Sequence, residues 1–430
     1  MPSSSRGGPT GRGRSAFRKW YSGPVAGGER EIVREAVRDG FERDQIPLFA
    51  RLVEQSSCSR EPEDVELAAL ILDARASELG LTIEHHVDPT ARHAAHRVYR
   101  TPATAEDDRA VALVGHVDTV FPRSLGFSGF RREGDLVHGP GVLDMKSGLS
   151  SMLAALAALR AAAPRAYAAL RARVVVVSDE EVGSPSSRGL FLSLAPRTTA
   201  ALVFEAGRTG DRIVTRRKGG GLWTLTAHGR AAHAGNAHAQ GVSAIHALAL
   251  VVPRLEAITD YARGLTVSVG LFDGGTAKNT VPERAELGLD ARFETARDAA
   301  ELEAQLRAIA GAPFEGLDGV PDKLRAHARI ELGGGVTRPP MEATDATQAL
   351  RARYEQVALE CGLGAGEAPL QGGGSDANLL AGAGVPCIDG LGPAGADFHQ
   401  TTERASLASL LRRTEALALF LLDEALASSP

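Results

Sequence analysis

The sequence predicts an α/β fold with a mostly parallel sheet, interrupted by an inserted ferredoxin-like α+β unit. Short apolar runs alternate with helical stretches at first, strands of alternating polarity appear near residue 218, and the first pattern returns after residue 335. Strands that alternate with helices favour a parallel sheet covered by helices. We therefore expect one domain built from residues 29–216 and 333–430, with the inserted unit over 217–332.

The composition is that of an ordinary globular protein. Of the 430 residues, 43% are hydrophobic and 23% are charged, and the formal net charge of −5 gives no indication of nucleic-acid binding. No stretch has the length of a signal peptide core or a membrane span, and the three cysteines are far apart, so we expect free thiols and a cytoplasmic protein. Residues 1–28 are basic and rich in Gly and Ser, which favours a disordered tail over a nucleic-acid-binding arm.

The first part of the main domain contains helices and buried strands in turn. One helix follows the acidic start Glu61–Asp64 and ends at Gly80. The run of four valines at 174–177 is typical of a strand covered on both faces. The pattern predicts helices over 46–55, 65–79 and 147–163, and strands over 81–83, 111–114 and 174–177.

The inserted unit has the order β-α-β-β-α-β of a split βαβ fold. Its strands are expected over 222–226, 265–272, 285–293 and 326–332, and its helices over 241–258 and 299–309. Three glycines at 333–335 are predicted to form a hinge back to the main domain. A helix over 341–361, a strand over 385–388 and a closing helix over 405–426 complete the chain.

Metal-binding residue types lie where buried strands end. His116 and Asp118 follow the strand at 111–114, Glu180 and Glu181 follow the strand at 174–177, and Glu205 follows the apolar run 200–204. Ligands of open α/β sheets bind beyond the carboxyl ends of the strands. Imidazole and carboxylate suit zinc, and a carboxylate can bridge two ions. The sequence therefore predicts a metal-dependent hydrolase.

The motifs H-x-D, G-x-D-M-K, D-E-E, F-E and a late F-H occur in this order between about residues 111 and 404. This order resembles the zinc metallopeptidase family of the glutamate carboxypeptidases, aminoacylases, succinyl-diaminopimelate desuccinylases and acetylornithine deacetylases, and is closest to the carboxypeptidase branch. The resemblance implies two zinc ions bridged by Asp144, although cobalt or manganese would also suit such ligands. His116 and Glu205 would complete one ion, and Glu181 and His399 the other.

The resemblance also separates the roles of neighbouring acids. Adjacent residues in an extended chain point to different faces, so Glu180 and Glu181 are not expected to bind the same ion. Glu181 is expected to bind metal, and Glu180 to act as the general base that takes a proton from the attacking water. Asp118 is expected to orient the imidazole of His116.

The inserted unit resembles the family's lid and dimerisation domain. His233, in a G-x-x-x-H-A-G loop, would stabilise the oxyanion across a homodimer interface or on domain closure, and Asn279 would contact the substrate. Arg292 would hold the substrate carboxylate with its planar guanidinium.

Two further segments are expected to bind substrate. Gly374 and Ser375 precede a helix, and their backbone N–H groups would clamp the same end of the substrate. Arg338 stands in an Arg-Pro stretch that resembles one in the glutamate carboxypeptidases, where an arginine helps to recognise an acidic side chain. By contrast, Arg216–Lys218 are interpreted as a solvated face between the domains.

The predicted activity is cleavage of an amide bond next to a free carboxylate, in an N-acyl amino acid or a short peptide, with C-terminal glutamate favoured. One alternative is an N-acyl-amino-acid deacylase, and another is a catalytically inactive binding protein that retains the lid domain. A phosphate-binding loop at 139–147 is a poor interpretation, because Met145 stands where a Walker sequence requires glycine. No nucleic-acid or membrane partner is expected.

Overall fold

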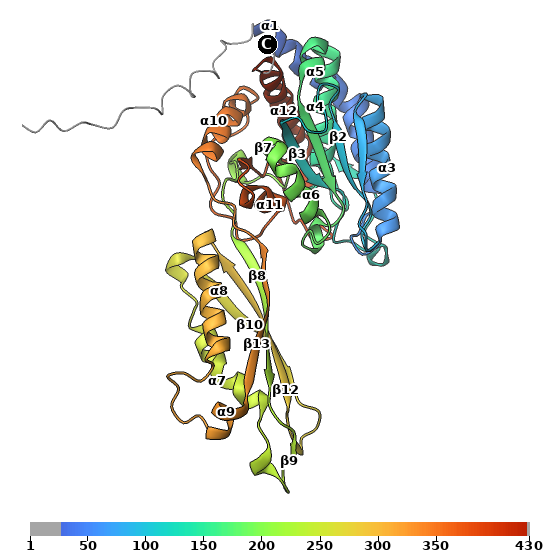
Figure 1. Ribbon diagram of the computed structural model, residues 1–430. Helices are drawn as coiled ribbons and strands as arrows, with labels where there is room; N and C mark the ends of the chain where they lie inside the picture. Colours follow the sequence, from blue (N-terminus) through green and yellow to red (C-terminus); the bar gives the residue numbers. More distant parts are fainter. Residues whose placement is uncertain (1–26, 428–430) are drawn as a thin grey trace, which may run out of the picture.

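The larger of two regions is built around a six-stranded, mostly parallel sheet (Figure 1). The computed structural model describes residues 27–427, so the predicted tail lies almost entirely outside the described residues. The four strands from the third to the last position run parallel, and the second strand pairs antiparallel with both of its neighbours. The spatial order is β1 (Thr82–His86), β2 (His96–Arg100), β6 (Ala172–Val177), β3 (Ala110–His116), β7 (Thr198–Val203) and β14 (Cys387–Ile388).

Helices cover both faces of this sheet, as the continuous apolar strands require. Alternate residues of β3 face opposite layers: Leu113 packs with α4 and α12, whereas Val114 packs with α6 and α11. The helices of this region are α1 (Gly27–Gly40), α2 (Ile46–Glu54), α3 (Pro62–Glu78), α4 (Lys146–Ala162), α5 (Pro164–Ala169), α6 (Ser187–Leu194), α10 (Asp345–Glu360), α11 (Asp376–Gly382) and α12 (Leu407–Ala427). None of the helices within residues 27–427 has the length and apolarity needed to cross a bilayer.

A small antiparallel sheet lies beside the large one. It pairs strands from early and late in the chain, since β16 pairs with β5. Its order is β15 (Gly395–Ala396), β16 (Arg404–Ser406), β5 (Leu136–His138) and β4 (Arg131–Glu133). The sheet thereby brings the loop after β5 close to the loop between β15 and β16.

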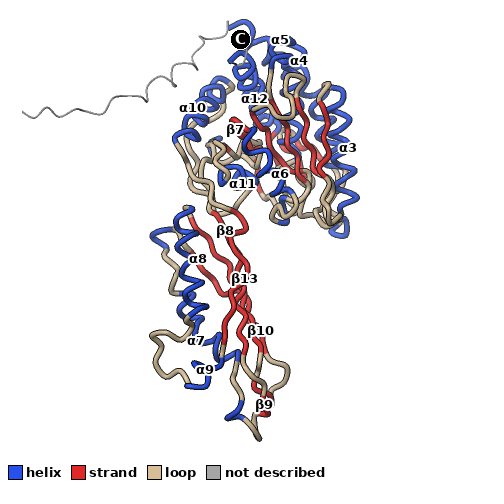
Figure 2. The backbone as a smooth tube through the Cα atoms, viewed as in Figure 1, coloured by secondary structure: helices blue, strands red, loops and turns tan. Residues whose placement is uncertain are grey.

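The second region is an α+β unit with a hydrophobic core of its own, extending away from the six-stranded sheet (Figures 1 and 2). Its strands have the order β10-β12-β8-β13, and all neighbours are antiparallel. The elements are β8 (Gly219–His228), α7 (Ala244–Glu256), β10 (Thr266–Gly274), β12 (Arg284–Phe293), α8 (Ala296–Gly311), α9 (Asp322–His327) and β13 (Arg329–Arg338). The predicted β-α-β-β-α-β order is thus present, with a short ribbon of β9 (Ala232–His233) and β11 (Thr280–Val281) added.

The predicted glycine hinge is wrong. Gly333, Gly334 and Gly335 lie inside β13, where they pair with Thr224, Trp223 and Leu222 of β8. Gly334 has φ +86°, and an added Cβ would lie 2.2 Å from the carbonyl oxygen of Leu222, so the close approach of the two strands requires glycine there. The expected strand over 326–332 therefore begins later and continues to Arg338.

Candidate active site

Three predicted metal ligands lie at the carboxyl ends of adjacent parallel strands. His116 is the last residue of β3, Glu181 follows the end of β6, and Glu205 follows the end of β7. Since β3 pairs in parallel with both β6 and β7, these ends meet at one edge of the sheet. The residues are buried or nearly so, because helices cover both faces up to this edge.

The small antiparallel sheet supplies the other two predicted ligands. Asp144 lies in the segment that leads from β5 into α4, and His399 lies in the loop between β15 and β16. His399 has a left-handed backbone with φ +63°, a conformation that is uncommon outside glycine. The first and last of the five ligand candidates, His116 and His399, are 283 positions apart in the sequence. All five nevertheless lie close together in the fold.

Asp144 lies between the two histidines. Its Oδ1 is 3.2 Å from Nε2 of His116, and its Oδ2 is 3.2 Å from Nε2 of His399. Glu181 Oε2 lies 3.1 Å from the same nitrogen of His399, and Glu205 Oε1 lies 3.9 Å from Nε2 of His116. One carboxylate oxygen toward each imidazole is the arrangement that a bridging ligand requires.

The cluster concentrates negative charge in a buried place. Burial, with a further contribution from the charge of Asp144, raises the pKa of Glu181 to about 7 and holds the pKa of Glu205 well above its usual range. Hydrogen bonds with Asp144 and Glu181 raise the pKa of His399 to about 10. Imidazole nitrogens and carboxylate oxygens in this number are suited to divalent zinc, cobalt or manganese, so the donor set fits paired metal ions.

Asp118 supports both histidine and glutamates. The Nδ1 atom of His116 lies 2.9 Å from the backbone carbonyl of Asp118 and 3.4 Å from its Oδ1 atom, which orients the ring. The Asp118 carboxylate accepts the backbone N–H groups of Glu180 and Glu181, both at 3.2 Å, and the hydroxyl of Ser59 at 2.6 Å. Asp118 therefore fixes the segment that carries both acids as well as the imidazole.

Glu180 and Glu181 have different partners, but not for the predicted reason. They lie in a single 3₁₀ turn, Glu180–Val182, rather than in an extended strand. Glu181 reaches His399, whereas Oε1 of Glu180 forms an ion pair with Arg338 at 2.8 Å. The turn separates the two carboxylates by its own geometry.

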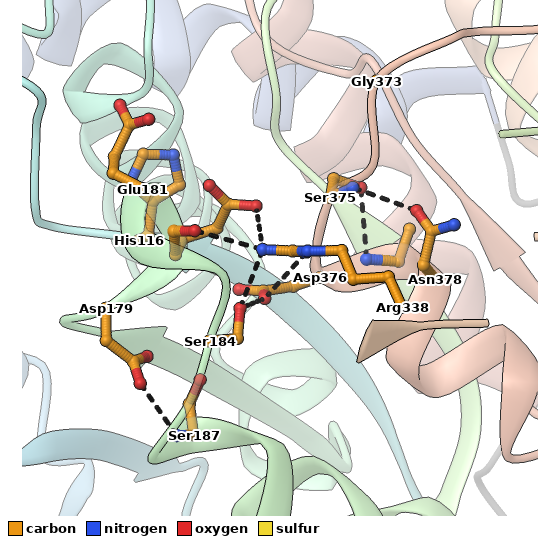
Figure 3. Close-up of polar contacts among 12 residues, drawn as sticks. His116, Asp179, Glu181, Ser184, Ser187, Arg338, Gly373, Ser375, Asp376 and Asn378 are labelled. Carbon is orange, nitrogen blue, oxygen red and sulfur yellow. Dashed lines mark hydrogen bonds and ion pairs between the residues drawn. The ribbon is translucent and has the colours of Figure 1, made fainter. Parts of the chain in front are cut away.

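Arg338 extends from the end of β13 into the main domain (Figure 3). Its guanidinium also donates to the carbonyl of Glu180 and to the hydroxyl of Ser184, each at 3.0 Å, and lies 3.7 Å from Asp376. The side chain is 13% exposed. Arg338 thus contacts the candidate general base, while its predicted contact with a substrate side chain stays a prediction.

The segment before α11 is already hydrogen-bonded within the chain. The backbone N–H of Ser375 donates to the side chain of Asn378 (Figure 3). The Ser375 hydroxyl accepts from the backbone N–H of Ala377 and donates to Asp389. Gly374 lies on the wall of the adjacent cavity. Of the predicted backbone clamp, Gly374 lies on the cavity wall, whereas the Ser375 side chain caps the start of α11, and the contact with substrate stays a prediction.

A cavity of about 220 Å³ opens beside the cluster. Glu180 lines it together with the ligand candidates Asp144, Glu181, Glu205 and His399. Gly374, which the sequence predicted to bind substrate, also lines the cavity. The remaining lining residues are ones that the sequence did not indicate for the site: Ala206, Arg208, Arg217, Gln371, Gly373 and Phe398.

The interpretation of Arg216–Lys218 as a solvated face is wrong for the middle residue. The Arg217 side chain is 4% exposed and forms an ion pair with the fully buried Asp389 at 2.6 Å. Arg217 is buried because it lies in the segment that leads from the main domain into β8. Its backbone pairs with Met341, and the residue lines the cavity. Arg216, in contrast, is exposed as expected.

Glu403 is a buried residue that the sequence analysis missed. Its carboxylate accepts backbone N–H groups of Gly141, Leu143 and Asp144 at 2.8 to 2.9 Å. Burial raises its pKa to about 7 although these three hydrogen bonds oppose the shift. Glu403 follows His399 by four residues, and only the pairing of β16 with β5 brings it under the Asp144 loop.

The predicted residues of the inserted unit lie away from the cavity. His233 pairs with Thr280 in the β9–β11 ribbon, beside Asn279, at the end of the unit farthest from the six-stranded sheet (Figure 1). Arg292 is on β12, exposed, and forms an ion pair with Asp290 at 2.7 Å. None of the three lines the cavity within residues 27–427.

A sequence profile of the peptidase family M20/M25/M40 matches residues 112–423. The chain belongs to this family. The family is metal-dependent, and the chain is accordingly a hydrolase that acts on amide bonds, with the candidate metal-binding group His116, Asp144 and Glu181.

Curated relatives cover nearly the whole chain. Carboxypeptidase G2 of Pseudomonas sp. (strain RS-16) is 26% identical over 381 residues, which are 88% of this chain and 88% of the relative. Succinyl-diaminopimelate desuccinylase of Xanthomonas oryzae pv. oryzae is 28% identical over 405 residues, with 85% of this chain and 95% of the relative covered. Among solved structures, aminopeptidase PepT from Bacillus cereus has a TM-score of 0.67 at 23% identity, covering 89% of this chain and 98% of its own, which supports the fold.

Proposed function

We propose that this hydrolase binds two zinc ions and cleaves an amide bond next to a free carboxylate, as a carboxypeptidase does. The observation that carries the proposal is Asp144, with one carboxylate oxygen directed at each of His116 and His399. Glu205 would complete the site of His116, and Glu181 that of His399. When bound, the ions would supply a Lewis acid for the scissile carbonyl and would lower the pKa of water.

Glu180 is the proton acceptor of the proposed reaction. It lines the same cavity as the ligand candidates and does not contact either histidine within the described residues. Arg338 holds its Oε1 atom at 2.8 Å, which fixes the direction of the carboxylate. Glu180 would take the proton from the attacking water and deliver it to the leaving amine.

The α+β unit is proposed to act as a lid and as the dimer interface. His233 and Asn279 are too remote from the cavity of their own chain to contact a substrate there in this arrangement (Figure 1). A homodimer, in which each unit serves the other subunit, or closure of the unit, would bring them in. The edge strand β10 supports the dimer, because Leu271 and Phe272 expose 76% and 43% of their surface on it.

The proposed substrates carry an acidic group. Carboxypeptidase G2 and the desuccinylase are both relatives of this chain, so the same site could release a C-terminal residue or remove an acyl group. We propose C-terminal glutamate release as the first activity and N-acyl-amino-acid deacylation as the second, since the desuccinylase matches over 95% of its length.

A hydrolysis screen tests the function. Dipeptides, N-acyl-glutamates and other N-acyl amino acids would be incubated with protein stripped of metal and then reloaded with zinc or cobalt. We expect turnover of at least one class, loss of turnover on chelation, and recovery on reloading. Full turnover by protein shown by elemental analysis to be free of metal would overturn the proposal.

A further inference from the structure

We infer that Arg208 binds a second carboxylate of the substrate, so that the site selects dicarboxylic compounds. The inference rests on the proposed function for the position of the scissile amide, and it assigns a specificity-determining residue to the cavity. The cavity is lined by groups of both charges. The acids Asp144, Glu181 and Glu205 of the candidate metal cluster line it, and so do Arg208 and Arg217.

Arg217 is already occupied. Its Nε atom donates to Asp389 at 2.6 Å, and one terminal nitrogen donates to the carbonyl of Gly373 at 3.0 Å. Since Asp389 is fully buried, this pair is an internal support of the wall. Arg217 therefore contributes positive charge to the cavity, but little capacity to bind a ligand.

Arg208 has no such partner. Among residues 27–427 it forms no ion pair and no side-chain hydrogen bond, and its Nε atom is buried without an acceptor. Asp389, whose charge acts on Arg208, is engaged by Arg217 and by the hydroxyl of Ser375. A buried donor that lacks an acceptor is costly, and a guanidinium facing a cavity is satisfied best by a carboxylate, which it binds through two parallel hydrogen bonds.

The other candidate arginines are less well placed for this role. Arg338 does not line the cavity and is engaged by Glu180 and Ser184. Arg292 lies outside the cavity and is paired with Asp290. Arg208 is thus the arginine of the described chain that both faces the cavity and has free hydrogen-bonding capacity.

Position and surroundings define the kind of group that Arg208 would bind. It follows Glu205, a proposed metal ligand, by three residues, and the aromatic ring of Phe398 lies on the same cavity. A substrate with its scissile carbonyl at the metal cluster would extend a short apolar linker past Phe398 to the guanidinium. A second carboxylate of this kind is present either on an acidic side chain of the released amino acid or on an acyl group derived from a dicarboxylic acid.

The first experiment compares each acid with its neutral counterpart. The side-chain pair is N-acetylglutamate against N-acetylglutamine, and the acyl pair is N-succinylalanine against N-butanoylalanine. The proteins are the zinc-loaded parent, Arg208→Gln, Arg208→Lys, and the control Arg212→Gln, which removes an exposed arginine four positions away that does not line the cavity.

We expect the parent to prefer the acid of one pair, and Arg208→Gln to reduce that ratio of kcat/KM by roughly 10- to 100-fold, as for loss of a charge-assisted hydrogen bond. Arg208→Lys should retain part of the preference, because charge remains while the planar fork is lost. Arg212→Gln should retain all of it. The pair that responds identifies the source of the carboxylate, and an unchanged ratio in Arg208→Gln with normal zinc content would overturn the inference.

A binding measurement separates this inference from the proposed activity. Glutarate, a dicarboxylate, and butyrate, a monocarboxylate, would be titrated calorimetrically into each zinc-loaded protein. Tighter binding of glutarate that disappears in Arg208→Gln supports the role of Arg208, even if the parent hydrolyses none of the four amides and the proposed activity fails. Equal binding of the two acids by the parent would overturn the inference even if amide hydrolysis is confirmed.

Discussion

The two regions of this chain differ in how completely they form their part of the site. In the six-stranded region, five ligand candidates lie together, with contacts of 3.1 to 3.9 Å among them, and four of the five line one cavity with Glu180. In the α+β unit, His233, Asn279 and Arg292 lie outside that cavity. We therefore expect the proposed metal site to form within one region, whereas the proposed oxyanion and carboxylate contacts need movement or a second subunit.

The two sets of residues differ because different parts of the structure hold them in position. The ligands of the first region follow strands that are hydrogen-bonded to one another and are covered by helices on both faces, so their positions are set by the core. His233 and Asn279 lie on a two-stranded ribbon at the tip of the unit, supported by its own local pairing. Residues at such a tip, away from the cavity of their own chain, can contact a substrate only after closure of the unit or across a subunit interface.

Removing Asp144 is expected to have the largest effect, because it tests whether the six-stranded region binds the metal ions through this carboxylate. We expect Asp144→Ala to lose both metals and to lower turnover by more than the about 10²- to 10⁴-fold that loss of a general base costs. Metal content by elemental analysis and kcat/KM would be measured beside Asp107→Ala, an exposed aspartate. Retention of two metal equivalents by Asp144→Ala would contradict the bridging role.

Glu180→Gln separates chemistry from metal binding within the same region. Because Glu180 contacts Arg338 rather than a histidine, the variant should keep its metal while kcat falls by about 10²- to 10⁴-fold. Glu181→Gln should instead lose metal, since Glu181 contacts His399 at 3.1 Å. The exposed Glu315→Gln serves as the control. Equal metal loss in both active-site variants would show that the two acids do not divide the roles.

His233→Ala examines the contribution of the α+β unit. Loss of an oxyanion donor should lower kcat by about 10²- to 10³-fold with unchanged metal content. If the donor acts on the other subunit, mixing His233→Ala with Glu180→Gln under conditions of subunit exchange should restore part of the activity, because some dimers then contain one intact site. Proven exchange without recovery would exclude the action in trans, and a monomeric mass in solution would exclude the dimer.

Glu403→Gln should have the smallest effect of the four. The glutamate accepts three backbone N–H groups around Asp144, and an amide offers one acceptor oxygen in place of two. We expect metal affinity to fall by about 10- to 100-fold, as is typical for groups that orient a ligand. Competition with a chromophoric chelator would measure this change, and parent-like affinity would show that the Asp144 loop holds its shape without Glu403.

The sequence by itself determined the central parallel strands and the order of the candidate metal ligands. The valine run of β6 and the apolar runs of β3 and β7 identified buried strands, and parallel strands bring the residues that follow them to one edge. The β-α-β-β-α-β order of the second region was also readable, because alternating and helical periodicities change clearly along the chain.

Only the tertiary structure decided which polar residues support and surround the ligands. Arg338 meets Glu180 across 158 positions of sequence, and Glu403 meets Asp144 across 259. Local periodicity carries no information on such contacts, because they depend on how β13 and β16 dock against other elements. The same holds for Arg217, which looks like a surface residue in its basic run, and for Arg208, whose significance comes from the cavity it faces and the partner it lacks.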